Sequence, residues 1–158
     1  MSMDEWSEFK AEQAADWLEH VRRLEHDAAT AQDRVDVLRS LALPSGIDYS
    51  LPSVKSSPSA DAIPNAVAKL VDAIGDYVDK LDAYATESID AAKRLQEIGD
   101  SRYRCVLMLY YVNGRTWEQV GATLKYAPEY CRHLRNDALP LVYDIMPREW
   151  RTMIPRAD

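Results

Sequence analysis

The chain of 158 residues is poor in glycine, phenylalanine and cysteine, with five, one and two residues respectively. So little glycine, together with few runs of β-branched residues, argues against an all-β fold. Cys105 and Cys131 stand singly in helical patterns, without the spacing of a metal site, so we expect two reduced thiols. No apolar run approaches the roughly 20 residues of a membrane span, and MSMDEWSEFK lacks the pattern of a signal peptide. We therefore expect a soluble cytoplasmic protein with no membrane partner.

Residues suited to catalysis are also scarce. The three histidines, His20, His26 and His133, are dispersed, and the carboxylate pairs fall on faces that we expect to be solvated. The sequence contains no glycine-rich phosphate loop and no GxSxG nucleophile elbow. We expect a protein that is not an enzyme, with no catalytic residue, no cofactor and no metal site.

Two long segments carry apolar residues at alternating intervals of three and four, the pattern of a coiled-coil seam. The first, within residues 1–43, has its seam at Ala14, Trp17, Val21, Leu24, Ala28, Ala31, Val35, Leu38 and Ala42. The second, over 63–98, has its seam at Val67, Leu70, Ile74, Tyr77, Leu81, Tyr84, Ser88, Ala91, Leu95 and Ile98. Charged residues between the seam positions, Arg22 among them, indicate a solvated face. We predict an all-α protein that begins with a long two-helix coiled-coil hairpin, and a homodimer or higher oligomer through the coils.

The segment 44–62 between these helices holds three prolines and six serines, so we expect a linker or a crossover loop. Its Ile47, Tyr49, Leu51 and Val54 are suited to pinning it to a helix surface. Charge is divided unevenly as well. Residues 1–99 have 10 basic and 19 acidic residues, whereas residues 100–158 have 9 and 7. We therefore divide the chain into an acidic oligomerisation arm (1–99), a second domain (100–146) and a tail (147–158).

The second domain shows a different pattern, of short helices. Asn113-Gly114 indicates a turn, and Thr116 followed by Gln119 is a capping box that starts a helix. The corner at 125–127 precedes Pro128, which suits the first turn of the next helix. That helix is predicted over 129–139, ending or kinking at Pro140. Its expected inward positions are Cys131, Leu134, Ala138 and Leu141.

Helix, corner and helix within residues 116–139 have the size of a helix-turn-helix, whose second helix enters the DNA major groove. Arg132 and Arg135 share one side of that helix and can reach phosphate or guanine, while His133 and Asn136 can bond to bases. Around the first helix, Arg115, Lys125 and Tyr126 are placed to contact the sugar-phosphate backbone. The alternative is that the arginines form an ordinary solvated face.

The stretch RCVLMLYYVNGRTWEQVGATLKYAPEYCRHLRNDALPLV resembles region four of sigma-70-type transcription factors. The matching residues are Thr116, Glu118, Val120, Gly121, Arg132, Ala138 and Leu139. The resemblance implies that Pro128, Glu129 and His133 occupy base-reading positions, with Glu129 suited to accept from a cytosine amino group. Pro128 and Tyr130 stand where that family places basic residues, which favours either an operator other than the minus-35 element or a weaker intrinsic affinity that dimerisation offsets. The candidate DNA-contacting residues are Arg115, Thr116, Lys125, Tyr126, Pro128, Glu129, Tyr130, Arg132, His133, Arg135 and Asn136.

The layout of long helices before a region-four-like module is similar to that of the late-gene regulators of phages and prophages, of the ArpU and RinA kind. This resemblance implies a sequence-specific regulator of transcription that binds double-stranded DNA, with RNA polymerase as a further candidate partner. The alternative function is that of a non-enzymatic helical assembly or adaptor protein, such as a small DNA-packaging subunit of a phage, with a vestigial helix-turn-helix.

Overall fold

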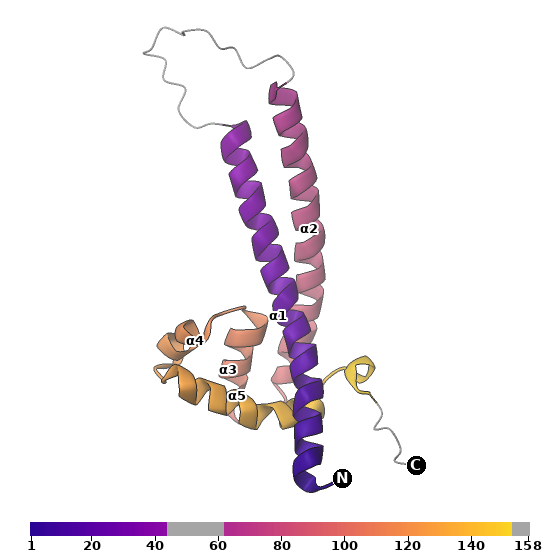
Figure 1. Cartoon of the computed structure of the whole chain (residues 1–158), viewed down its shortest axis with the longest axis vertical. Coiled ribbons are helices and arrows are strands. Elements are labelled where there is room, and N and C mark those ends of the chain that lie inside the picture. Colours follow the sequence, from indigo (N-terminus) through magenta and orange to yellow (C-terminus); the bar gives the residue numbers. More distant parts are fainter. Residues whose placement is uncertain (44–61, 153–158) are drawn as a thin grey trace. The chain divides into compact units, whose positions relative to one another are not determined.

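The computed structural model describes residues 1–43 and 62–152, and this part of the chain is all-α, as predicted (Figure 1). The helices are α1 (Met3–Ala42), α2 (Ala62–Leu95), α3 (Ser101–Leu107), α4 (Trp117–Leu124) and α5 (Pro128–Tyr143), with a π-helical turn at Met108–Val112 and a 3-10 turn at Arg148–Trp150. Among the described residues, no helix combines the length and the apolarity needed to cross a bilayer.

The chain forms two compact units, and each long helix contributes to both. The first unit contains Met1–His26 and Tyr84–Asp158, and the second contains Asp27–Ala83. Sequence analysis places the boundary between the arm and the second domain after residue 99. In the compact units, by contrast, the start of α1 and the end of α2 belong with the C-terminal helices. The predicted linker lies outside the described residues, except for Ala62 at the start of α2, as does the tail from residue 153 onward.

In the second unit, the predicted seam of α1 is buried against α2. Val35 packs with Leu70 and Ala73, and Leu38, Ala42 and Tyr77 surround this cluster. Three positions of the predicted α2 seam, Val67, Ile74 and Leu81, are exposed in this unit and do not join the cluster with Val35. With 3.6 residues per turn, a helix that turns Leu70 and Ala73 toward Val35 directs these three side chains to its flank.

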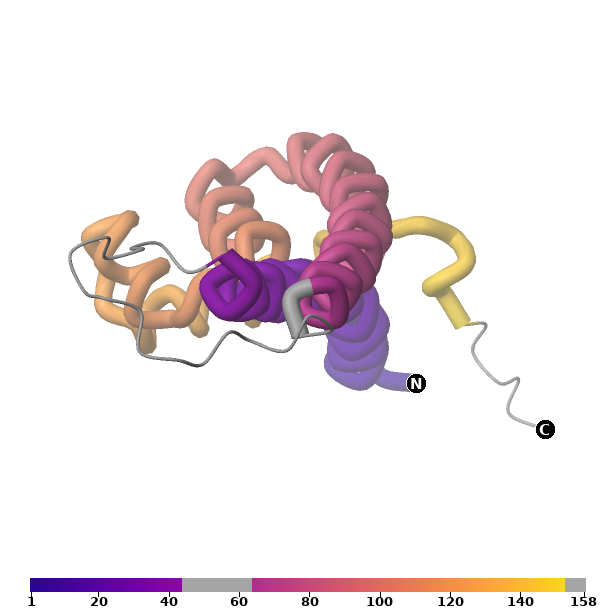
Figure 2. Tube along the Cα trace, turned by 90° about the horizontal axis from the view of Figure 1, so that it is seen from above, coloured from indigo at the N-terminus to yellow at the C-terminus, as the bar shows by residue number. Residues whose placement is uncertain are grey.

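The core of the first unit contains residues of α1, α2, α3 and α5. Its largest fully buried side chains are Trp17 and Tyr111. The other buried members are Ala14, Leu18, Val21, Ala91, Leu95, Ile98, Leu107, Val112, Ala138, Leu139, Val142 and Met146. Figure 2 shows the chain leaving α2 through a short connection into α3, with α4 and α5 following. The C-terminal half of α5 shares this core with the first half of α1, and Trp6 near the start of α1 meets Tyr143 edge-on at 5.8 Å.

The segment after α2 begins as an α-helix and then widens. Asp100 caps α3 by accepting a hydrogen bond from the Arg102 amide over 2.9 Å. After Leu107 the chain forms the π-helical turn, in which the Asn113 amide donates to the Met108 carbonyl, five residues back, over 2.8 Å. The sequence pattern gave no sign of the widening.

The end of α5 corrects two further predictions. The helix continues past Pro140 to Tyr143, and Leu141 points to solvent, 47% exposed. Proline at this position removes one helical donor, a loss that the burial of Leu139 and Val142 in the core offsets. Because the buried positions step from Ala138 to Val142, four residues on, Leu141 falls outside the packed side.

Candidate nucleic-acid interface

The start of α4 is the capping box predicted from the sequence. The Gln119 amide donates to the Thr116 hydroxyl over 3.2 Å, and the Thr116 amide donates to the Gln119 side-chain oxygen over 3.0 Å. Each bond satisfies a backbone donor at the start of the helix that would otherwise lack a partner. The prediction is confirmed, with α4 beginning at Trp117.

The corner between α4 and α5 is fixed by one left-handed residue and one close backbone approach. Lys125 ends α4 with φ 60° and ψ 41°, the left-handed region that glycine usually occupies. The Tyr126 amide then donates to the Gly121 carbonyl over 3.0 Å. A Cβ at Gly121 would lie 2.6 Å from the Tyr126 carbonyl oxygen and 3.3 Å from the Pro128 nitrogen. Only glycine fits there without a shift, so the angle between the two helices depends on this residue.

One side of α5 is packed and the other is open. Cys131 and Leu134 join Val106 and Val120 in a buried cluster that ties α5 to α3 and α4. The opposite side, in the first turns of α5, carries predicted DNA-contacting residues. Four of them are exposed to solvent: Glu129, Tyr130, His133 and Asn136. The sequence pattern therefore predicted correctly which side of the first turns of α5 faces solvent.

Arg132 and Arg135 are half-buried, because both guanidinium groups lie near the Trp117 ring. Their central carbons are 5.9 Å and 5.1 Å from its centroid. Arg135 also donates to the Asn136 side-chain oxygen over 2.8 Å and to the Tyr111 hydroxyl over 3.4 Å. The cation–π contacts with Trp117, the first residue of α4, therefore partly order both guanidinium groups without any ligand.

Charge on the open side of α5 is mixed. Glu129 lies 3.0 Å from an Arg132 guanidinium nitrogen and 3.8 Å from the His133 ring. Both pairs are solvent-exposed, so each contributes little to stability, but the carboxylate offsets part of the positive field along α5. Arg115 and Lys125 differ, since both are exposed and no described carboxylate lies within ion-pair distance of either.

The predicted residues form two groups at opposite ends of α4. Arg115 and Thr116 precede this helix, whereas Lys125 and Tyr126 follow it, so roughly 12 Å of helix separates them. The corner group is continuous with the start of α5, because Tyr126 meets Tyr130 edge-on at 5.1 Å. The structure therefore brings the corner and the start of α5 together, with Arg132 and Arg135 beside Trp117.

Arg102 belongs beside this group, although sequence analysis did not select it. Its guanidinium donates to the Tyr130 hydroxyl over 3.1 Å and to the Asp100 carboxylate over 2.8 Å. The Asp100 hydrogen bond raises the pKa of Arg102, and the same bond lowers the pKa of the Asp100 carboxyl. Arg102 precedes Tyr130 by 28 residues, so no local pattern could have revealed the contact.

The turn that leads into α4 is held by Arg22, which the sequence pattern assigned to a solvated face. Its guanidinium lies over the Tyr110 ring, 3.9 Å from the centroid, and donates to the Tyr110 carbonyl. It also donates to the Arg115 carbonyl over 2.8 Å. The assignment was wrong because the carbonyls of a π-helical turn and of the loop after it lack helical partners, and Arg22 supplies them with donors.

Two more side chains hold the same turn. The Tyr84 hydroxyl donates to the Val112 carbonyl over 2.6 Å, and the His26 ring lies 3.2 Å from the Gly114 carbonyl. Burial raises the pKa of Tyr84. The position of α4 is thus set from outside the helix-corner-helix segment, by residues of α1 and α2 within the same compact unit.

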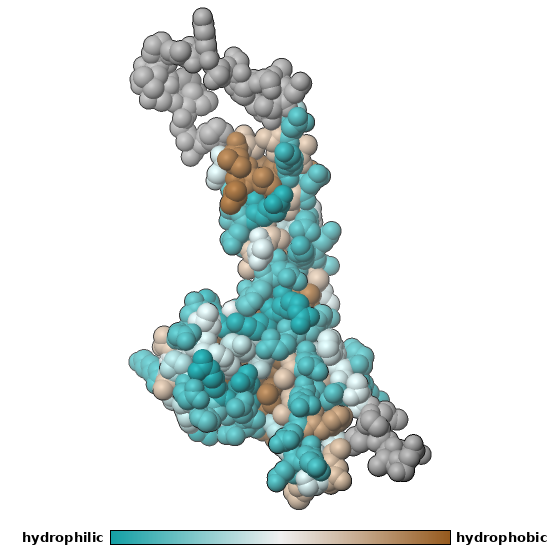
Figure 3. Space-filling model, viewed as in Figure 1, coloured by the Kyte–Doolittle hydropathy of each residue, from teal (hydrophilic) through white to brown (hydrophobic). Residues whose placement is uncertain are grey.

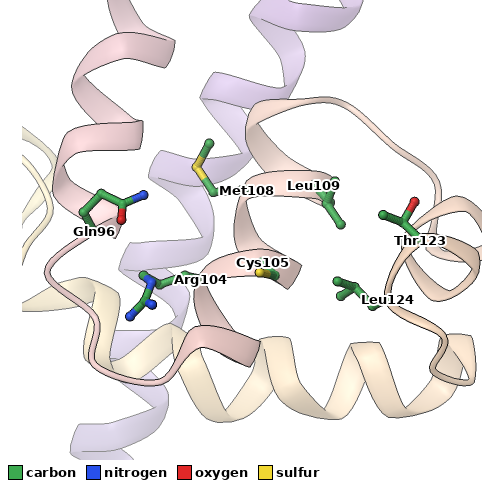
Figure 4. Close-up of a pocket in the computed structure, with 7 residues that line it drawn as sticks. All are labelled: Gln96, Arg104, Cys105, Met108, Leu109, Thr123 and Leu124. Atoms are coloured by element: carbon green, nitrogen blue, oxygen red, sulfur yellow. The ribbon is translucent and has the colours of Figure 1, made fainter.

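A pocket of about 330 Å³ lies between α3 with its π-helical turn and α4 (Figure 4). It is lined by Gln96, Arg104, Cys105, Met108, Leu109, Thr123 and Leu124. Arg104 is engaged with backbone, donating to the Ile98 and Gly99 carbonyls over 2.6 Å and 3.0 Å. The remaining lining is largely apolar and contains no carboxylate or histidine, so it offers no acid-base pair for chemistry.

In the part of the chain that the structure describes, no cluster of three histidine, cysteine or carboxylate side chains is placed to hold a metal ion. No family model, curated protein or solved structure matches the chain. A functional assignment therefore depends on the geometry of α4, the corner and α5.

Proposed function

We propose that the protein is a sequence-specific DNA-binding regulator of transcription, with α5 as the recognition helix of a helix-turn-helix. The observation that carries this proposal is the open side of the first turns of α5, which adjoins the corner and the two arginines beside Trp117. A solvent-exposed helix start preceded by a short, rigid corner is what a major groove can accept. The resemblance to region four of sigma factors supports the same assignment.

In this proposal, Glu129, His133 and Asn136 read base edges. They are exposed within the first nine residues of α5, the part of a recognition helix that lies deepest in the groove. Glu129 accepts from a cytosine amino group, and Asn136 is suited to adenine. A base that donates to the Glu129 carboxylate would release Arg132 from its ion pair, and the guanidinium could then contact phosphate. Base recognition by Glu129 and phosphate binding by Arg132 would therefore be linked.

Anchoring to the backbone falls to basic residues at both ends of α4. Arg115 and Lys125 lack a described carboxylate partner and can neutralise phosphate without first breaking an ion pair. Phosphate contacts set the register of the protein on the duplex, while base contacts set specificity. Pro128 and Tyr130, at the start of α5, would supply shape and an aromatic surface rather than charge.

The partners follow from this assignment. Double-stranded DNA is the ligand, two or more copies of the chain bind together, and RNA polymerase is a candidate for direct contact. We infer a sigma-like regulator of phage or prophage genes from the resemblance in layout, and a role without catalysis, metal or cofactor. Two recognition helices held in one dimer would read half-sites a helical turn, or a multiple of it, apart.

Selection of bound sequences from a random duplex pool, followed by fluorescence anisotropy on the enriched duplex, tests the proposal. We expect enrichment of one motif and tighter binding to it than to a scrambled duplex, with affinity falling steeply as salt rises. Failure to retain any duplex at low ionic strength would contradict it.

A helical assembly or adaptor protein is the second candidate, and two observations favour it. Glu129 lies among the basic residues of α5, and α2 exposes apolar residues that DNA binding does not use. In that case pull-down with the full chain would recover a protein partner, and the enriched-duplex experiment would return no motif.

A further inference from the structure

The exposed apolar residues of α2 in the second unit form one continuous stripe. Val67, Val71, Ile74, Val78 and Leu81 follow intervals of four, three, four and three, so they lie on one side of the helix. Between 39% and 61% of the surface of each is exposed. We call this set the outer stripe. Such spacing, with β-branched valines at alternate positions, is that of a coiled-coil seam.

The outer stripe is separate from the side of α2 that packs on α1. Leu70, Ala73 and Tyr77 take that inner side, next to Val35. A helix with two apolar sides is typical of a position between two other helices, because a surface helix needs only one. Helix α1 has one long seam, and its exposed large apolar residues are Met3 at its start and Val37 and Leu41 near its end. Figure 3 shows a hydrophobic patch near the end of α1.

Gly75 leaves an open position beside the outer stripe. It lies in the interior of the 34-residue helix α2, where glycine destabilises relative to alanine. No atom of this chain comes within 4 Å of the place where its Cβ would be, so no contact within the chain requires glycine. A second backbone approaching Val71, Ile74 and Val78 would meet this open position next to Ile74.

The exposed area suits an interface between two copies. The five side chains leave roughly 400 Å² of largely apolar surface in water, within the range of about 300–600 Å² for the largest patch on an ordinary monomer. Two stripes in contact would bury about 800 Å², and flanking residues would bring the total toward the roughly 1,200 Å² at which specific interfaces begin. A two-fold axis through the stripe would place apolar residues of one copy opposite apolar residues of the other, since none of the five positions is charged.

We propose that the outer stripe is the homodimer seam, in which α2 of one copy packs against α2 of a second copy. This inference adds to the proposed function the surface that holds two DNA-binding units together. It does not require DNA, and the experiment below contains none, so its failure would leave the proposed function to be decided by duplex binding.

The test is sedimentation equilibrium of the full chain, in its parental form and in three variants. Val71→Glu with Val78→Glu places two carboxylates in the seam, and we expect the dimer dissociation constant to rise about 100-fold or more. Val37→Glu is the matched control, since this valine on α1 is 59% exposed, close to the 61% and 54% of the two stripe residues. Gly75→Ala should weaken the dimer about 5-fold by adding a methyl group at the contact.

The outcomes separate the possible occupants of the stripe. A parental dimer that dissociates in the double variant and persists in Val37→Glu would support the proposal, provided that circular dichroism shows equal helix content. A monomeric parent at about 100 µM would overturn it. Equal dissociation by Val37→Glu, an undisturbed double variant, or a tighter dimer for Gly75→Ala would overturn it too.

Discussion

The Arg22 guanidinium lies over the Tyr110 ring, 3.9 Å from its centroid, and donates a hydrogen bond to the Arg115 carbonyl just before α4. Arg22 and Arg115 are 93 residues apart in the chain. One side chain of α1 thereby joins two ends of the segment between α3 and α4. The contact makes the middle of α1 part of the support for the candidate DNA-binding helices. Loss of this side chain should be felt in stability and in the orientation of α4.

Arg22→Ala should lower the free energy of unfolding by about 2 kcal/mol, because it leaves the partly buried Tyr110 carbonyl and the exposed Arg115 carbonyl without their donor and removes the contact with the Tyr110 ring. Urea denaturation followed by circular dichroism measures the change. Arg23→Ala is the matched control, since Arg23 is the exposed neighbour on the same helix and should change stability by less than about 0.5 kcal/mol. Equal effects would show that the contact contributes nothing.

Gly121→Ala should destabilise the protein by about 1–3 kcal/mol, because the added Cβ would meet the Tyr126 carbonyl oxygen at 2.6 Å. The obstacle is backbone, so the corner must open for alanine to fit. Gly99→Ala serves as the control, since nothing lies within 4 Å of the place that its Cβ would take. Thermal unfolding of the two variants side by side decides the matter, and a Gly121 variant as stable as the Gly99 variant would contradict the close approach.

Tyr111 predicts a loss of stability in alkaline solution. Burial raises its pKa above the ordinary value of 10.0, although Arg135 acts in the opposite direction. The folded chain therefore keeps the phenolic proton at a pH where the unfolded chain has lost it. This contribution is complete below pH 10 and is lost as pH rises through the folded-state pKa. The stability advantage of the parent over Tyr111→Phe should then fall by at most about 1.4 kcal/mol per pH unit.

Urea midpoints measured from pH 8 to about pH 11 give this difference directly. Tyr126→Phe removes the same hydroxyl from an exposed side chain and serves as the control. A parent-minus-variant difference for Tyr111 that stays constant with pH would show that the phenol titrates alike in both states.

Arg132→Ala together with Arg135→Ala should weaken binding to the selected duplex about 100-fold and lower the salt slope by about 2, one for each phosphate that is no longer neutralised. Stability should change by about 1 kcal/mol or less, mainly through the removal of the two cations from the Trp117 ring. Arg34→Ala with Arg39→Ala removes the same charge from exposed positions of α1. If that control pair weakens binding as much, the effect is one of net charge and the α5 face is not the contact surface.

Glu129→Gln should act in two directions at once. Removing the carboxylate 3.0 Å from Arg132 frees that guanidinium, so affinity for a scrambled duplex should rise about 3-fold to 10-fold. Discrimination at the base that Glu129 reads should fall, because the amide can donate as well as accept. Anisotropy with the selected duplex and with single-base variants measures both. A Glu129→Gln variant that keeps full discrimination would remove Glu129 from the set of base-reading residues.

Local patterns predicted much of the fold. Heptad spacing predicted α1, including the burial of Ala14, Trp17 and Val21, and the capping box predicted the start of α4 at Thr116. Pro128 at the first turn of α5 is another local signal that the structure confirms. Each of these depends on residues within about one or two helical turns, where periodicity and capping chemistry are strong.

Long-range packing accounts for what the sequence did not reveal. Arg22 has the same local pattern as any charged residue on a helix surface, and its partners at Tyr110 and Arg115 are distant in sequence. Likewise, apolar residues in α2 form two adjacent sides, and only the contact with Val35 shows which of them faces α1. DNA contact by the exposed residues of α5 stays a prediction.

The π-helical turn at residues 108–112 holds one residue more than an α-helix spanning the same length. This extra residue sets the direction in which the side chains after it point. A single deletion there would restore ordinary helical winding and rotate every later side chain of the segment by about 100°. Tyr111 and Val112 would swing out of the core, and the backbone oxygens met by Arg22 and Tyr84 would turn away. Length changes should therefore be far less tolerated in these five residues than amino-acid exchanges of equal volume.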